Sequence, residues 1–159
     1  MTDYEYDLAV LGSGPGGLGA ALQCLARGGK VCLAEEKKIG GVCVNVGCMP
    51  TKAMLRAGKL CWEMKHAEQF GIRGGDPEVD SKAFMHRVNS ITEDIAHHAD
   101  EAMTSRDGVT VLRGHARLAA ADRAVVRTEE GEKEVRARAV VIATGARPVR
   151  PDFLPWDSP

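Results

Sequence analysis

A glycine-rich segment near the N-terminus places the strongest constraint on the fold. The stretch DLAVLGSGPGGLGAALQCL sets Gly12, Gly14 and Gly17 in a G-x-G-x-x-G pattern directly after an apolar run at residues 8–11. A short apolar run of this kind is typical of a parallel strand buried on both faces. Leucine and alanine then recur at helical spacing, and a second apolar run follows at residues 31–34. This order predicts two parallel strands joined by a helix.

The glycine pattern within this unit indicates a dinucleotide site. Its glycines allow a tight turn, close approach of a pyrophosphate, and close packing of the helix on the strand. The start of the helix offers free N–H groups and the positive end of its dipole to phosphates. Glu35 ends the second strand eighteen residues after Gly17, where a carboxylate can accept hydrogen bonds from an adenosine ribose. The alternative for Glu35 is a solvated turn, the interpretation that we give to Glu36, Lys37 and Lys38.

The remaining segments predict two further helices and several strands. One helix is expected from Pro50, a residue suited to a first turn, to about Glu68, and an amphipathic helix from Ser81 to about Met103. After Gly108 the hydrophobic period becomes strand-like. We expect a small antiparallel sheet from residues around 109–137. Residues 140–143 should return to the parallel sheet because AVVIA is apolar on both faces.

A pair of cysteines in GGVCVNVGCMPTK, residues 40–52, raises the question of reactivity. Cys43 and Cys48 could be unrelated buried thiols, half of a zinc site, or a redox dithiol. Zinc needs about four ligands, and no second Cys or His pair has the required spacing; His97 and His98 fit the solvated side of the second long helix. Flanking glycines give the backbone freedom to close a small ring, and a helix start favours a thiolate. We therefore predict a redox-active dithiol/disulfide and no metal site.

Composition argues against several other functions. The chain has 159 residues, 44% of them hydrophobic and 27% charged, which suits one globular domain or part of a larger protein. A net charge of -1 and an aromatic content of 4% give no case for nucleic-acid binding. No run of about 18 apolar residues predicts a membrane span. Five cysteines and an N-terminus unlike a signal peptide predict a cytoplasmic location.

Three motifs together resemble one enzyme family. GSGPGG, GGVCVNVGCMPTK and VVIATGARP occur in the order and spacing of the class I pyridine nucleotide–disulfide oxidoreductases, and the resemblance covers the whole chain. It implies a Rossmann-like α/β FAD-binding fold of three layers: a parallel sheet, helices and a small antiparallel sheet. Within the family the chain is most similar to the dihydrolipoyl dehydrogenases, which oxidise protein-bound dihydrolipoamide with NAD. Mercuric reductase, another disulfide reductase, or a truncated FAD-binding module without turnover are the alternatives.

The resemblance also implies roles for individual residues. Cys48 matches the thiol nearest the flavin, Cys43 the interchange thiol that reacts with substrate, and Lys52 the lysine near flavin N5. The expected FAD contacts come from several parts of the chain. They are Gly12, Ser13, Gly14, Pro15 and Gly16 at the pyrophosphate, Glu35 at the ribose, and the backbone of His115 and Ala116 at the adenine. The other expected contacts are Ala143, Thr144 and Gly145 in the ATG turn, and Glu36, Gly41, Val42, Cys43, Cys48 and Lys52. The His115 imidazole could instead only face solvent. Cys24, Cys32 and Cys61 match nothing reactive, so we expect ordinary buried or helix-face cysteines.

The family's chains are longer than this one, which leads to an expectation about domains. Residues 1–150 should be the first segment of the FAD-binding domain, with the redox disulfide, and residues 151–159 the start of a crossover into an NAD(P)H domain absent from this chain. We accordingly expect a fragment that is inactive alone and forms a homodimer when full length. Its partner would be a lipoyl-bearing protein or a small disulfide. None of the five histidines matches the family's acid–base histidine.

Overall fold

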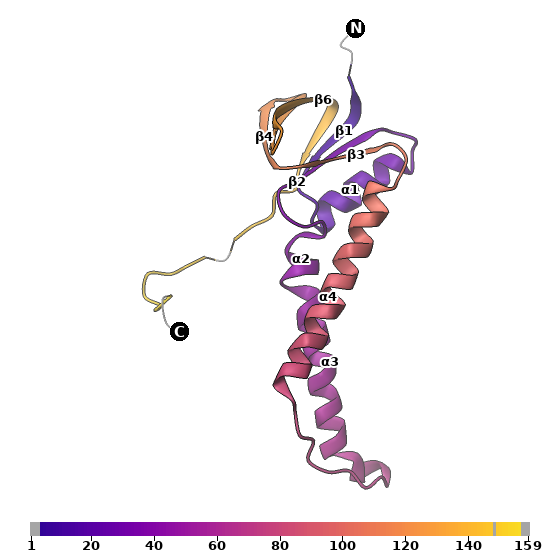
Figure 1. Cartoon of the computed structure of the whole chain (residues 1–159), viewed down its shortest axis with the longest axis vertical. Helices are drawn as coiled ribbons and strands as arrows, with labels where there is room; N and C mark the ends of the chain where they lie inside the picture. Colours follow the sequence, from indigo (N-terminus) through magenta and orange to yellow (C-terminus); the bar gives the residue numbers. More distant parts are fainter. Residues whose placement is uncertain (1–3, 148, 157–159) are drawn as a thin grey trace.

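The computed structural model describes residues 4–147 and 149–156, and it shows a sheet from which a pair of long helices extends (Figure 1). The strands form one continuous six-stranded sheet in the order β3-β2-β1-β6-β5-β4. The elements are β1 (Tyr6–Leu11), α1 (Pro15–Leu25), β2 (Val31–Glu35), α2 (Gly41–Asn45), α3 (Cys48–Lys65), the 3-10 helix η1 (Ala67–Phe70), α4 (Ser81–Thr104), β3 (Val109–Arg113), β4 (His115–Ala120), β5 (Arg123–Thr128) and β6 (Gly131–Ile142).

The parallel half of the sheet contains β3, β2, β1 and the second half of β6. Leu8 pairs with Val31 of β2, which confirms the predicted βαβ unit. On the other side of β1, Val10 pairs with Val141 of β6. The ladder continues one residue beyond β6, because the Ala143 N–H donates to the Leu11 carbonyl at 2.8 Å. The predicted return of residues 140–143 to the parallel sheet is therefore confirmed.

The antiparallel half contains β4, β5 and the first half of β6. The prediction that this sheet begins near residue 109 is wrong, because residues 109–113 form β3 and pair in parallel with β2. Gly114 divides the continuous-looking run VTVLRGHARL, since a Cβ atom there would lie 2.1 Å from the Arg127 carbonyl oxygen. This close approach lets the chain leave the parallel half and enter the antiparallel half within one residue.

Two hydrophobic clusters separate three layers. Alternate residues of β1 and β2, such as Leu11 and Ala34, face the antiparallel strands and pack with Val126 and Val135. The intervening residues, such as Val10 and Leu33, face the helices instead. Both faces of the parallel strands are thus buried, which explains their unbroken apolar sequence. The expected three-layer α/β fold is confirmed.

The helices α3 and α4 run side by side away from the sheet (Figure 1). Helix α3 begins at Cys48 and ends at Lys65, slightly before the predicted boundary near Glu68. Helix α4 begins after Asp80, whose side chain accepts hydrogen bonds from the N–H groups of residues 82 and 83. In the described part of the chain, no helix combines the length and apolar character that a membrane span requires.

After β6 the chain leads away from the sheet (Figure 1). Its described end is a turn in which the Trp156 indole N–H donates to the Pro151 carbonyl at 2.7 Å, and the Arg150 guanidinium lies 5.7 Å from the indole centroid. The crossover expected at residues 151–159 extends into residues 157–159, which lie outside the described residues.

Candidate functional site

The glycine loop joins β1 to α1 and has the geometry that its sequence predicts. Gly12 has a φ of +100°, and a Cβ there would lie 2.3 Å from the Ala143 carbonyl oxygen. A Cβ on Gly17 would lie 1.9 Å from the Gly12 carbonyl oxygen. Neither position has room for a side chain, so glycine lets the helix start directly against the strand ends.

The outer side of this loop is open. A Cβ on Gly14 or Gly16 would meet no heavy atom within 4 Å. Gly14 caps α1 without a side-chain hydrogen bond, and the next residue, Pro15, occupies the first turn. The cap residue therefore supplies no side-chain acceptor to the first turn of α1. The positive end of the helix dipole at this turn favours an anionic group such as a pyrophosphate.

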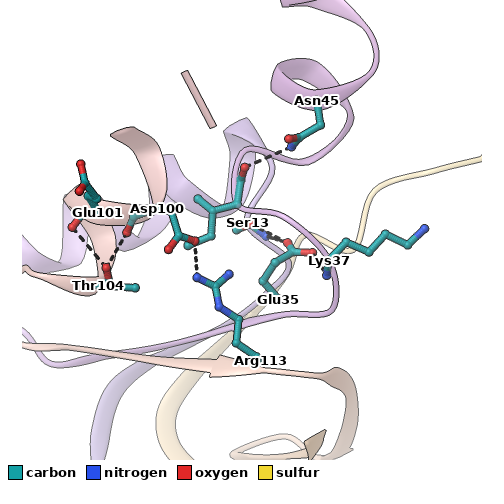
Figure 2. Close-up of polar contacts among 9 residues, drawn as sticks. Ser13, Glu35, Lys37, Asn45, Asp100, Glu101, Thr104 and Arg113 are labelled. Carbon is teal, nitrogen blue, oxygen red and sulfur yellow. Dashed lines mark hydrogen bonds and ion pairs between the residues drawn. The ribbon is translucent and has the colours of Figure 1, made fainter. Parts of the chain in front are cut away.

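Glu35 lies beside the glycine loop because β1 and β2 are parallel neighbours (Figure 2). Its Oε2 accepts hydrogen bonds from the Ser13 backbone N–H at 2.9 Å and from the Ser13 hydroxyl at 2.5 Å. Its Oε1 accepts from the Lys37 backbone N–H at 2.8 Å. The carboxylate is thus held at the edge of the loop, where a ribose ligand is expected.

The end of the site where adenosine is expected contains a contact between two side chains that the sequence pattern did not reveal. His115, the first residue of β4, lies with Nδ1 3.6 Å from Oε2 of Glu36, and both side chains are exposed. The two residues are distant in sequence and meet because β4 crosses near the end of β2. Glu36 is exposed, as predicted, but it contacts an imidazole at the site rather than solvent alone.

The cysteine segment packs directly on the glycine loop. The Gly40 N–H donates to the Ser13 carbonyl at 3.0 Å, and a Cβ on Gly41 would lie 2.8 Å from the Gly14 Cα. Asn45 holds the short helix α2 in place, since its side-chain amide donates to the carbonyls of Ile39 and Gly41 at 3.1 and 2.9 Å. The sequence analysis predicted neither α2 nor the role of Asn45 in holding it. The only sequence feature that indicates this contact is an asparagine four residues after a glycine.

Cys43 in α2 and Cys48 at the first position of α3 are free cysteines whose thiols are in hydrogen-bonding contact. The hydrogen bond to Cys48 raises the pKa of the Cys43 thiol above its ordinary value, while the nearby positive charge of Lys52 acts in the opposite direction. A hydrogen bond raises a pKa when the protonated group donates it. The contact with Cys48 therefore favours the protonated form of Cys43.

The remaining predicted site residues, and the four other histidines, differ in their position and exposure. The ATG turn adjoins the loop, because the Thr144 Cα is 3.1 Å from a Cβ built on Gly12. Val42, Lys52 and Gly145 are exposed, and Ala116 is half-buried. His66, His86, His97 and His98 are exposed on α3, its end or α4.

The three cysteines outside the pair have different environments. Cys24 and Cys61 are half-buried, whereas Cys32 is buried in the parallel sheet. Burial raises the pKa of Cys32 to about 12, so its thiol is held protonated and unreactive. Among residues 4–147 and 149–156, no cluster of three or more His, Cys, Asp or Glu side chains is placed to hold a metal ion.

The family follows from comparison with known proteins. The chain matches the family model described as pyridine nucleotide-disulphide oxidoreductase over residues 6–155. The chain belongs to this family. Proteins named dihydrolipoyl dehydrogenase from Chlorobaculum parvum and Zymomonas mobilis are 38% and 36% identical to it over 145 and 148 residues. These matches cover 91% and 92% of this chain but 31% of each relative, so the chain spans about a third of their length.

A solved structure supports the same fold. The Cu(II) complex of the HOCl-induced flavoprotein disulfide reductase RclA from Escherichia coli superposes with a TM-score of 0.74 at 23% identity. The match covers 94% of this chain and 31% of that one. The predicted family and its Rossmann-like three-layer fold are both confirmed.

Proposed function

We propose that this chain is the FAD-binding, dithiol-bearing part of a flavin disulfide oxidoreductase that oxidises protein-bound dihydrolipoamide with NAD. Residues 1–150 would be the first segment of the FAD-binding domain, and residues 151–159 the start of a crossover to an NAD(P)H domain. The full-length protein would act as a homodimer. The names of the relatives support the choice of substrate, at modest identity and over this part of their length.

The observation that carries the proposal is the direct contact between the two motifs. Gly40 is hydrogen-bonded to Ser13 of the nucleotide loop, and three residues later Cys43 is in hydrogen-bonding contact with Cys48. A dinucleotide lying on the open side of the loop is thereby brought next to a pair of thiols. A cofactor site and a dithiol that served separate functions would not need this shared packing.

The dithiol can take two electrons from a substrate dithiol. In the disulfide form, a substrate thiolate attacks the sulfur of Cys43, the Cys43–Cys48 bond breaks, and Cys48 leaves as a thiolate at the start of α3, where the helix dipole stabilises it. The second substrate thiolate then displaces Cys43, and the substrate leaves as a disulfide. Of the two protons that the substrate thiols lose, one ends on the Cys43 sulfur, where the hydrogen-bonding contact with Cys48 favours the protonated form, and the other goes to solvent.

Several residues of this chain fit a bound FAD. The first turn of α1 would hold the pyrophosphate, Glu35 the adenosine ribose, and Lys52 would place its positive charge beside the dithiol. When bound, FAD would supply the two-electron acceptor that returns the pair to the disulfide form.

The first test measures cofactor binding and thiol chemistry on the 159-residue chain. FAD titration followed by flavin fluorescence should show saturable binding, weaker than that of an intact relative because the chain spans 31% of the relatives' length. Mild oxidation should remove two of the five titratable thiols, and Cys48→Ser should abolish this loss. Cys61→Ala is the matched control and should still lose two thiols.

The second test concerns the substrate. Dihydrolipoamide should restore both thiols of the oxidised chain faster than an equal concentration of glutathione. We expect no NAD reduction by the chain alone, and recovery of activity only within a full-length protein. Absence of FAD binding would contradict the cofactor assignment. Faster reduction by glutathione would contradict the choice of dihydrolipoamide as substrate and would indicate a disulfide reductase that acts on another class of substrate. A disulfide that includes Cys24 or Cys61 would show that the dithiol is assigned wrongly.

A further inference from the structure

Ser13 differs from its neighbours in the glycine loop because its side chain faces inward. It is the one buried polar side chain of residues 4–147 and 149–156, with no exposed surface. Gly14 and Gly16 border the open side of the loop, where a pyrophosphate fits. The Ser13 hydroxyl instead points to the end of β2 and contacts Glu35 (Figure 2).

The hydrogen bonds of Glu35 determine which of its oxygens is available to a ligand. A carboxylate has about four acceptor positions, two on each oxygen. The amide and the hydroxyl of Ser13 fill both positions on Oε2, at 2.9 and 2.5 Å. The Lys37 N–H fills one position on Oε1. The remaining acceptor position of the carboxylate is therefore on Oε1.

We infer that Ser13 is a positioning residue that orients Glu35 for recognition of the adenosine ribose. By holding Oε2 with two donors, it presents Oε1 to a ribose hydroxyl group. Hydrogen bonds to a carboxylate are charge-assisted and directional, so the pair fixes the rotamer of Glu35 before a ligand arrives. This inference rests on the proposed function and adds how the chain recognises the adenosine half of its cofactor.

A double-mutant cycle on FAD affinity tests this role. Ser13→Ala should weaken FAD binding by about fivefold, the effect of losing one ordering hydrogen bond. In a Glu35→Ala background, Ser13→Ala should have no further effect, because Ser13 acts only through Glu35. Ser105→Ala is the matched control: it also removes a serine hydroxyl that donates a hydrogen bond, here to the Glu101 carbonyl in α4, and should leave FAD affinity unchanged.

A second readout isolates the ribose. Displacement of bound FAD should require less ADP than 2′,3′-dideoxy-ADP for the wild-type chain, and Ser13→Ala should reduce this preference. Far-UV circular dichroism checks the fold of each variant, and Ser13→Gly replaces Ser13→Ala if the latter does not fold.

The outcomes separate this inference from the proposed function. Failure of the wild-type chain to bind FAD would overturn both. FAD binding that Ser13→Ala leaves unchanged would overturn the positioning role alone. The positioning role would also be overturned if Ser13→Ala lowered FAD affinity in the Glu35→Ala background, because Ser13 would then act by contacting the cofactor directly. An unchanged preference for ADP over its dideoxy analogue would likewise overturn the role.

Discussion

At the scale of single residues, the environment of each cysteine gives a physical reason for its expected reactivity. Cys32 is buried between the sheet layers, and burial raises its pKa to about 12. Cys43 lies near the surface, and its pKa is raised mainly by a hydrogen bond with Cys48. Burial favours the protonated form of Cys32, whereas a hydrogen bond with a neighbouring thiol favours the protonated form of Cys43.

The protonation of Cys43 can be measured by its alkylation rate. Because the hydrogen bond to Cys48 raises the pKa of Cys43 above the ordinary 9.0, its reaction with iodoacetamide in the reduced chain should reach half its maximal rate above that pH. Cys48→Ala removes the hydrogen-bond partner of Cys43 and should move the midpoint to lower pH. Peptide mass spectrometry assigns the alkylated site, and Cys61→Ala is the control. A midpoint that does not move in Cys48→Ala would contradict the thiol–thiol contact.

At the scale of elements, helix boundaries position the site. Helix α3 begins at Cys48, so the proposed redox pair, Cys43 and Cys48, lies on the two sides of a helix start. Helix α4 packs against both α2 and α3, which carry the two cysteines, and its buried residues are Val88 and Met103. Its far end is tied to the sheet by an ion pair between Arg113 of β3 and Asp100 (Figure 2).

The N-cap of α4 gives a prediction at this scale. Asp80→Ala removes the acceptor for two backbone N–H groups and should lower the free energy of unfolding by about 1 kcal/mol. Asp80→Asn keeps an oxygen acceptor and should cost much less. Urea denaturation followed by circular dichroism measures both. Equal stability of the alanine and asparagine variants would show that the cap contributes little.

At the scale of the whole molecule, α3 is a helix of 18 residues none of which is buried. Leu55 and Trp62 are 66% and 55% exposed on this helix, which extends away from the sheet with α4 (Figure 1). Apolar side chains gathered on one exposed helix favour contact with another protein surface. The chain should therefore associate with itself at high concentration.

Sedimentation velocity can test this association. The wild-type chain should form larger species as its concentration rises, and Leu55→Glu combined with Trp62→Glu should reduce them. Leu118→Glu is the control, because Leu118 is also exposed, at 46%, but lies on β4. A concentration-independent monomer, or an equal effect of the control, would argue against association through α3.

The sequence by itself determined those features that depend on local spacing. The glycines of the loop, the apolar runs of β1 and β2, and the amphipathic period of α4 each express a backbone or packing requirement within one element. For the same reason the nucleotide loop and the Cys43–Cys48 pair could be proposed as sites from their flanking residues alone. The parallel position of residues 140–143 was also predictable, because only a strand covered on both faces is uniformly apolar.

Only the tertiary structure decided how these pieces meet. VTVLRGHARL has the period of one strand, but the close approach of Gly114 to Arg127 divides it between the two halves of the sheet. The inward direction of Ser13, the pairing of Glu36 with His115, and the contact of Cys43 with Cys48 all depend on strands and helices packed against one another. Hydrogen bonds between distant segments leave no periodic trace in a sequence, because they need only one suitable residue on each side.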